Sequence, residues 1–165
     1  MSIRRKNDLI HNAGFTLLEV LIAVFVLATG LLGLAGLQAA TLSNNQSAYN
    51  RSQATRLAYD MAERIRSNFV VAKNLQNSTY ITINPDAATA QTDCAAVSTT
   101  CTASDMAQND LFLWYQDLTN TLPSGTGSIA VNAATRVFTI TINWDDNRDG
   151  LVNSSDPNFQ MSLDL

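Results

Sequence analysis

The sequence predicts an α+β fold in which a long N-terminal α-helix, its first half inside a membrane, packs against a C-terminal antiparallel β-sheet, with a second short helix. Residues 15–37 are almost entirely apolar, residues 38–73 continue with helical periodicity, and the segments 128–132, 136–144 and 158–165 have the pattern of strands. The expected parts are a leader (1–14), a transmembrane helix (15–37), its amphipathic continuation (38–73) and a globular domain (74–165).

The apolar segment predicts a single membrane crossing. Its 23 residues include one ionisable side chain, Glu19, and this length is enough to span a bilayer as a helix. The 14 residues before it contain three basic side chains and one acidic one. Positive residues favour the cytoplasmic side. We therefore expect an inner-membrane protein with a cytoplasmic N-terminus and a periplasmic C-terminal domain.

Composition argues against an enzyme and against nucleic-acid binding. The only His, His11, precedes the membrane segment, so histidine-dependent nucleophiles and metal sites are lacking beyond it. Residues 74–165 contain two Arg and ten Asp, a net charge of −8. Such a surface repels phosphate backbones.

The amphipathic part of the helix has an apolar stripe at spacings of three and four residues: Ala54, Ala58, Met61, Ile65 and Phe69. Asp60 and Arg64 are placed to form an i,i+4 ion pair. One helix to about residue 73 is expected; the alternative is two helices hinged in the polar segment 41–47.

The globular domain should begin with a short strand at 78–84, closed by Pro85. A helix is expected at about 104–122, capped by Ser104 and ended by Pro123. Its apolar stripe consists of Leu111, Trp114, Leu118 and Leu122. Strands are expected at 128–132, 136–144 and 158–165, the last two forming an antiparallel hairpin. Both Trp114 and Trp144 are explained as core anchors beneath this sheet.

Cys94 and Cys101 lie in a polar stretch on the exported side. In an oxidising periplasm they are expected to form a disulfide; the alternative is two free thiols.

The segment Gly14-Phe15-Thr16-Leu17-Leu18-Glu19, joined directly to the apolar run, resembles the leader-cleavage signature of type IV pilins and the related pseudopilins of type II secretion. The resemblance implies a pilin-like fold and cleavage after Gly14 by a membrane-bound prepilin peptidase. That enzyme would also methylate the new N-terminus on Phe15. The apolar segment is then retained as both anchor and assembly element, unlike a conventional secretory signal.

Glu19 is costly inside hydrocarbon, by about 2.5 to 3.5 kcal/mol, so a partner is expected. By resemblance, the amine of Phe15 in a neighbouring subunit pairs with it during assembly. The alternatives are a Glu19 that reaches water at the interface and a conventional signal-peptidase cut near Gly33.

Gly30, Gly33 and Gly36 lie three residues apart in the second half of the membrane segment. They favour close helix packing. The alternative is that they loosen this stretch in an assembled filament.

Within the family, the distal part resembles the minor pilins through its Cys pair, Asp110, Trp114, Leu118, Leu122-Pro123 and a strand that runs into residues 139–146. This resemblance implies a subunit that primes pilus assembly with other minor pilins and the major pilin. The inner-membrane assembly platform and a tip adhesin are further implied partners. The rivals are a secretion pseudopilin and a tethered periplasmic binding domain.

The segment 145–156 matches the ligand spacing of an EF-hand-like calcium loop. The candidate ligands are Asp145, Asn147, Asp149, Leu151, Asn153 and Asp156. The alternative is an acidic hairpin connection with a tight turn at Asp149-Gly150. No other cofactor is expected.

Overall fold

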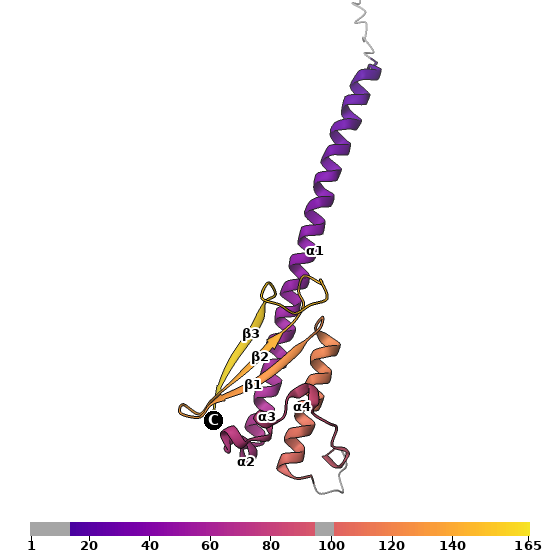
Figure 1. Cartoon of the computed structure of the whole chain (residues 1–165). Coiled ribbons are helices and arrows are strands. Elements are labelled where there is room, and N and C mark those ends of the chain that lie inside the picture. Colours follow the sequence, from indigo (N-terminus) through magenta and orange to yellow (C-terminus); the bar gives the residue numbers. More distant parts are fainter. Residues whose placement is uncertain (1–13, 95–100) are drawn as a thin grey trace, which may run out of the picture. The chain divides into compact units, whose positions relative to one another are not determined.

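The long helix is continuous. The computed structural model describes residues 14–94 and 101–165, in which α1 (Leu17–Ser67) forms one helix through residues 41–47 (Figure 1). The hinged alternative is therefore wrong. The chain divides into two compact units, residues 1–44 and 45–165, and α1 contributes to both.

The described part of the first unit, residues 14–44, consists mainly of the apolar half of α1. Every described side chain from Gly14 to Asn44 is exposed. An 18-residue window of α1 has a mean hydropathy of 2.6. By length and composition, this helix can cross a membrane.

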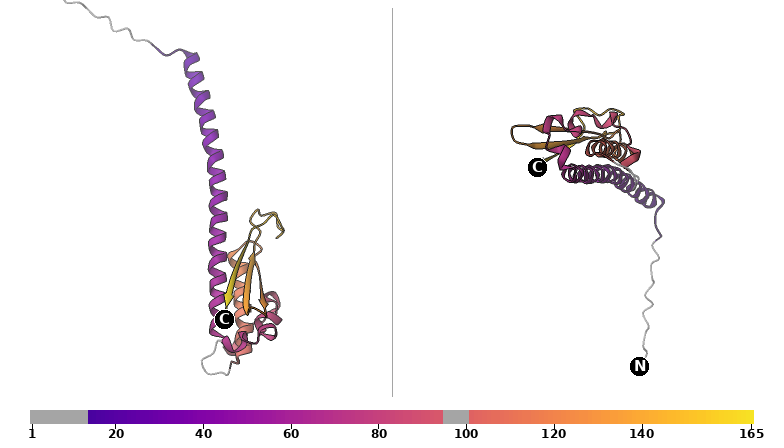
Figure 2. Two further views of the ribbon diagram at one scale, coloured as in Figure 1. Left: turned by 90° about the vertical axis from the view of Figure 1, so that its left-hand side faces the viewer. Right: turned by 90° about the horizontal axis from the view of Figure 1, so that it is seen from below.

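The second unit contains an antiparallel sheet of order β1-β2-β3. Its strands are β1 (Thr126–Asn132), β2 (Val137–Asn143) and β3 (Asn158–Asp164). Ile140 in the central strand lies opposite Ile129 of β1 and Met161 of β3. The distal part of α1 and helix α4 (Ala103–Thr121) lie along one side of the sheet (Figure 2). The predicted α+β pilin-like fold is confirmed.

The core lies between the sheet and the two helices. Alternate β2 residues Phe138, Ile140 and Ile142 are fully buried, as their pattern predicts. Trp114 and Trp144 are also fully buried, and the Trp114 indole Nε1 donates to the Leu57 carbonyl at 3.0 Å. This bond joins α4 to α1 while satisfying a buried polar group.

The helix α1 ends earlier than its apolar stripe predicts. Asn68 has non-helical backbone angles, and its side-chain Nδ2 donates to the Ala103 carbonyl at 2.6 Å. The chain resumes as the short helix α2 (Phe69–Ala72). As a result Phe69, expected in the buried stripe, is 48% exposed.

The predicted strand at 78–84 is also wrong. Residues Thr79–Thr82 form a short helix, α3. Tyr80 is buried there and its hydroxyl donates to Asp110 Oδ2 at 2.7 Å, so a tertiary contact overrides the β-propensity of the segment. Helix α4 is predicted correctly, but its cap is Thr102 rather than Ser104. The Thr102 hydroxyl accepts from the Asp105 N–H at 3.1 Å in a capping box.

Candidate functional site

The start of α1 is organised by Thr16. Its hydroxyl accepts from the Glu19 N–H at 3.3 Å, and its carbonyl accepts from the N–H groups of Glu19 and Val20. The spacing Thr-x-x-Glu is that of a capping box. Glu19 therefore lies in the first helical turn, where the helix dipole favours a carboxylate. Gly14 to Thr16 precede the helix without regular secondary structure.

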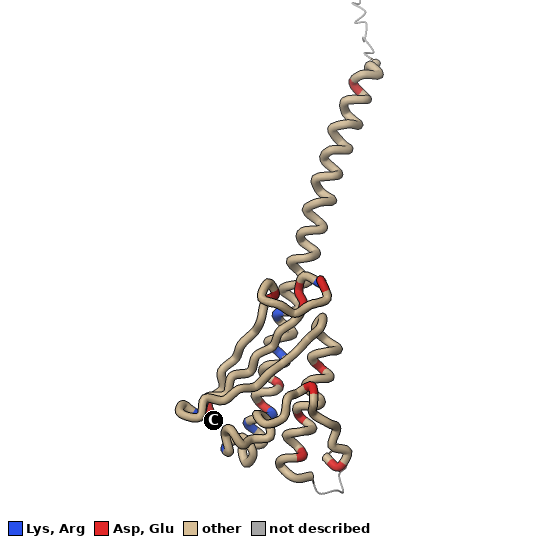
Figure 3. Tube along the Cα trace, in the orientation of Figure 1, with Lys and Arg blue, Asp and Glu red and all other residues tan. Residues whose placement is uncertain are grey.

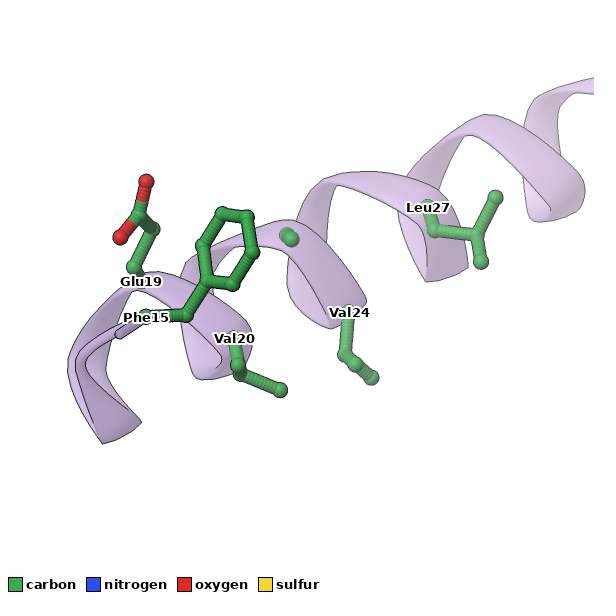
Figure 4. A pocket seen from close by; sticks show the side chains of 6 residues that line it. Phe15, Glu19, Val20, Val24 and Leu27 are labelled. Carbon is green, nitrogen blue, oxygen red and sulfur yellow. The ribbon is translucent and has the colours of Figure 1, made fainter. Parts of the chain in front are cut away.

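Glu19 is the one charged group in a surface hollow lined by Phe15, Glu19, Val20, Ala23, Val24 and Leu27 (Figure 4). Phe15 is 83% exposed. In the described part of the chain Glu19 forms no salt bridge. An apolar surface with one unpaired carboxylate is suited to receive a cationic group together with apolar contacts from another chain. Cleavage after Gly14 and methylation of Phe15 stay predictions.

Two hydroxyl groups further along the apolar half of α1, those of Thr29 and Thr41, are satisfied within the helix. Thr29 Oγ1 donates to the Val26 carbonyl at 2.9 Å and Thr41 Oγ1 donates to the Leu37 carbonyl at 2.8 Å. Such internal bonds remove most of the cost of placing a hydroxyl in hydrocarbon. Glu19 is thereby singled out as the polar group for which this segment supplies no counter-charge.

Gly30, Gly33 and Gly36 are part of the same uninterrupted helix. No atom lies within 4 Å of the position that a Cβ would occupy at any of them. The folded chain therefore does not itself require glycine at these positions. Close packing by a neighbouring helix and loosening within a filament both stay predictions.

The disulfide Cys94–Cys101 is formed, with a Cα–Cα distance of 4.9 Å. Cys94 ends a short 3-10 turn (Thr92–Cys94), and Cys101 immediately precedes the cap of α4. The bond therefore ties the loop before α4 to the start of that helix.

The Asp-rich loop is held by its own main chain. Asp145 is 3% exposed, and its two carboxylate oxygens accept from the N–H groups of Asp149 at 3.2 Å and Gly150 at 2.9 Å. Gly150 has a φ of 89°, which favours glycine. Asp156 likewise accepts from the N–H groups of Asp146 and Asn153. Within residues 14–94 and 101–165 no group of three or more His, Cys, Asp or Glu side chains is placed to hold a metal, and calcium binding stays a prediction.

A group of side-chain hydrogen bonds, termed the polar junction, attaches this loop to α1. Sequence periodicity does not predict it. Asp146 Oδ1 accepts from Trp144 Nε1 at 2.9 Å and from Asn50 Nδ2 at 3.1 Å. Partial burial alone would raise the pKa of Asp146. Hydrogen bonds from Ser47, Trp144 and Asn50, with the charge of Arg51, outweigh burial and lower that pKa. Asn50 is itself buried, so the junction is part of the packed structure.

A second polar cluster lies between α1, α3 and α4. Arg64 pairs with Asp60 at 2.9 Å, as predicted, and also with the buried Asp110 at 3.2 Å. Burial, assisted by the hydrogen bond to Asp110, raises the pKa of the Tyr80 hydroxyl. Burial opposes the charge on Arg64, yet its two carboxylate partners raise its pKa overall. The cluster joins three helices and is satisfied internally, which indicates a structural role.

Two family models match the chain. The model described as Type IV pilin Tt1218 matches residues 36–112. The model described as Prokaryotic N-terminal methylation motif matches residues 10–35. No curated protein and no solved structure matches.

Proposed function

We propose that this type IV prepilin-like protein is a minor pilin that helps to prime pilus assembly and sits at the pilus tip. Its resemblance is to the type IV pilus modification protein PilV. Prepilin peptidase would cut after Gly14 and methylate Phe15. The assembly platform would then insert the subunit together with other minor pilins, in a pilus that serves twitching motility and adhesion. The role is structural rather than enzymatic.

The observation that supports the proposal is the unpaired Glu19 within an apolar segment of helix in which every described side chain is exposed. A simple membrane tether needs no carboxylate at this depth, because the charge only makes insertion less favourable. A subunit that must align with the N-terminal amine of a neighbour gains an electrostatic contact there. The pilin-family match to residues 36–112 extends the support into the second unit.

The test is a clean deletion scored in parallel for sheared surface pili and for type II enzyme secretion. We expect loss of pili with intact secretion, restored by the wild-type chain and not by Glu19→Ala. Asp117→Ala is the matched control, because it removes a carboxylate of the same charge from an exposed position of helix α4, outside the apolar segment. It should restore pili.

Other outcomes would identify the rivals. Loss of secretion with intact pili would make the protein a pseudopilin. No change in either phenotype would favour a tethered binding domain. An intact mass lacking the apolar segment would show conventional signal-peptide cleavage and overturn the proposal.

A further inference from the structure

The solvent side of the distal part of α1 has a distinct composition. Opposite the buried stripe, residues at spacings of three and four are all exposed: Tyr49, Ser52, Arg56, Tyr59, Glu63 and Arg66. These six residues are termed the basic stripe. Tyr49 and Tyr59 are each 55% exposed, which is high for aromatic side chains with apolar rings. Tyr and Arg are the residue types most enriched at binding hot spots.

Arg56 is the arginine of this stripe that forms no ion pair with a described residue. Arg66 pairs with Glu63, whereas the Arg56 Nε donates only to the neutral Gln53 side chain at 3.0 Å. No described carboxylate pairs with Arg56. The stripe therefore offers an uncompensated guanidinium between two exposed aromatic rings.

The same unit has a surface of opposite charge. Residues 74–135 contain five Asp and no basic residue; Asp110 is buried and pairs with Arg64, and the other four are exposed or partly exposed. In Figure 3 the distal part of α1 has basic residues interspersed with acidic ones, whereas α4 and the described segment before it have acidic residues alone. A hollow of about 250 Å³ opens on this acidic side; it is lined by Asn84, Pro85, Asp86, Tyr115, Thr126 and Gly127. It is termed the acidic hollow.

The polar groups of the acidic hollow are unused within the folded chain. The side chains of Asn84, Asp86, Tyr115 and Thr126 form no hydrogen bond or ion pair with any other described residue, although other polar side chains of this unit are heavily bonded. A carboxylate, an amide and an aromatic ring around one opening match the needs of a guanidinium, which pairs with carboxylates and stacks on rings.

We propose that the basic stripe of one copy of this chain docks on the acidic hollow of a second copy, with Arg56 entering beside Asp86 and Tyr115. The inference deepens the proposed function, because it names a contact between subunits. The two surfaces lie on different elements of the fold, so the contact is heterologous where the same pair of copies does not also form the reciprocal contact. A heterologous contact leaves one stripe and one hollow free at the ends of each pair and can continue from copy to copy.

The test uses the full chain in the membrane, with two copies that bear different tags. One copy carries Tyr59→Cys and the other Thr126→Cys. The two native cysteines are bonded to each other, so the introduced thiols are the ones that react. A short bifunctional maleimide should give a covalent dimer from the mixed pair and not from Tyr59→Cys alone.

Charge reversal provides the second arm. Arg56→Glu in the stripe copy should lower the yield of the mixed dimer by about fivefold, the upper range for an exposed ion pair. Asp86→Arg in the hollow copy should lower it similarly when introduced alone, and should restore it when combined with Arg56→Glu. Arg148→Glu makes the same charge change at an exposed loop residue outside the stripe and should leave the yield unchanged.

Three results would overturn the inference: a dimer from Tyr59→Cys alone, a yield insensitive to both charge reversals, or crosslinks only to a different pilin. The proposed function is tested separately by the deletion. If deletion abolishes pili while no mixed dimer forms, the docking inference fails alone. If the dimer forms but deletion leaves pili intact, the docking stands and the pilus role fails.

Discussion

The two halves of α1 have the same secondary structure for different reasons. In the distal half, Asn50, Ala54, Leu57, Ala58, Met61, Ala62 and Ile65 are buried by the chain's own fold. In the apolar half no described side chain is buried. An apolar surface of this extent requires a partner, either lipid or neighbouring helices. Residues of the apolar half should therefore affect insertion and assembly, whereas buried residues of the distal half should affect folding.

The largest expected effect is at Trp114. We expect Trp114→Ala to destabilise the second unit by about 4 kcal/mol, because it creates a large cavity and removes the indole hydrogen bond to the Leu57 carbonyl. Denaturant unfolding in detergent, followed by the fluorescence of the buried Trp144, measures this. Leu27→Ala, at a position 62% exposed in the apolar half, is the matched control and should leave the midpoint unchanged. Equal losses from both variants would contradict the division between the two halves.

Two glycines, one in each region, differ in what surrounds them. A Cβ at Gly127 would lie 2.4 Å from Cη2 of Trp114, whereas a Cβ at Gly33 would meet nothing within 4 Å. Gly127→Ala should cost about 2 kcal/mol in unfolding experiments through overpacking. Gly33→Ala should leave the stability of the second unit unchanged while reducing the recovery of sheared pili, because any close contact at that position comes from another chain. If Gly33→Ala left pilus recovery at the wild-type level, close packing at this glycine would be excluded.

Acid should release the junction between α1 and the Asp-rich loop. The folded state lowers the pKa of Asp146 below its unfolded value of about 3.9. Its contribution is therefore present at neutral pH and is lost as the pH falls below about 4 through the folded pKa. Asp146→Asn should cost about 1 kcal/mol at pH 7, the scale of a lost charge-assisted hydrogen bond. In thermal melts, the difference in Tm from wild type should narrow steadily below pH 4.

The control for that measurement is Asp117→Asn, at an exposed carboxylate that accepts no hydrogen bond from the described residues. Its Tm at pH 7 should match that of the wild type. If the difference in Tm between Asp146→Asn and wild type stayed constant from pH 7 to pH 2, Asp146 would stabilise the fold through packing rather than through its charge.

Local periodicity predicts most of the helices and strands of this fold but few of its long-range side-chain hydrogen bonds. The alternation at Phe138, Ile140 and Ile142 identifies the central strand, and the stripe from Leu111 to Leu118 identifies α4. The segment 78–84 is misassigned because Tyr80 is placed by Asp110, 30 residues away, rather than by its neighbours. The bond from Asn50 to Asp146 joins residues 96 positions apart. Neither hydrogen bond could be predicted from local sequence periodicity, because its two residues are far apart in the sequence.

The sequence identifies the residues at the start of α1, but the hydrogen bonds that Thr16 forms there are seen only in the structure. The motif from Gly14 to Glu19 identifies the segment, and the Thr-x-x-Glu spacing contains the signal for the cap that Thr16 forms. The basic stripe is likewise visible as spaced residues. Its proposed counterpart is not, because Asp86, Tyr115 and Thr126 come together only when α4 packs beside the turn at 85–87 and the start of β1.

The smallest expected effect is that of calcium. Asp145 and Asp156 already accept main-chain N–H bonds, so a bound ion would compete with these donors for the same oxygens. Even a site with a Kd near 1 mM would add only about 0.4 kcal/mol at 1 mM calcium. We expect the Tm in 1 mM calcium to lie within about 1 °C of that in chelator. A rise of several degrees that Asp156→Asn abolishes would instead make the loop a calcium site. Its conformation would then depend on an ion, whereas the apolar half of α1 depends on lipid or a neighbouring chain.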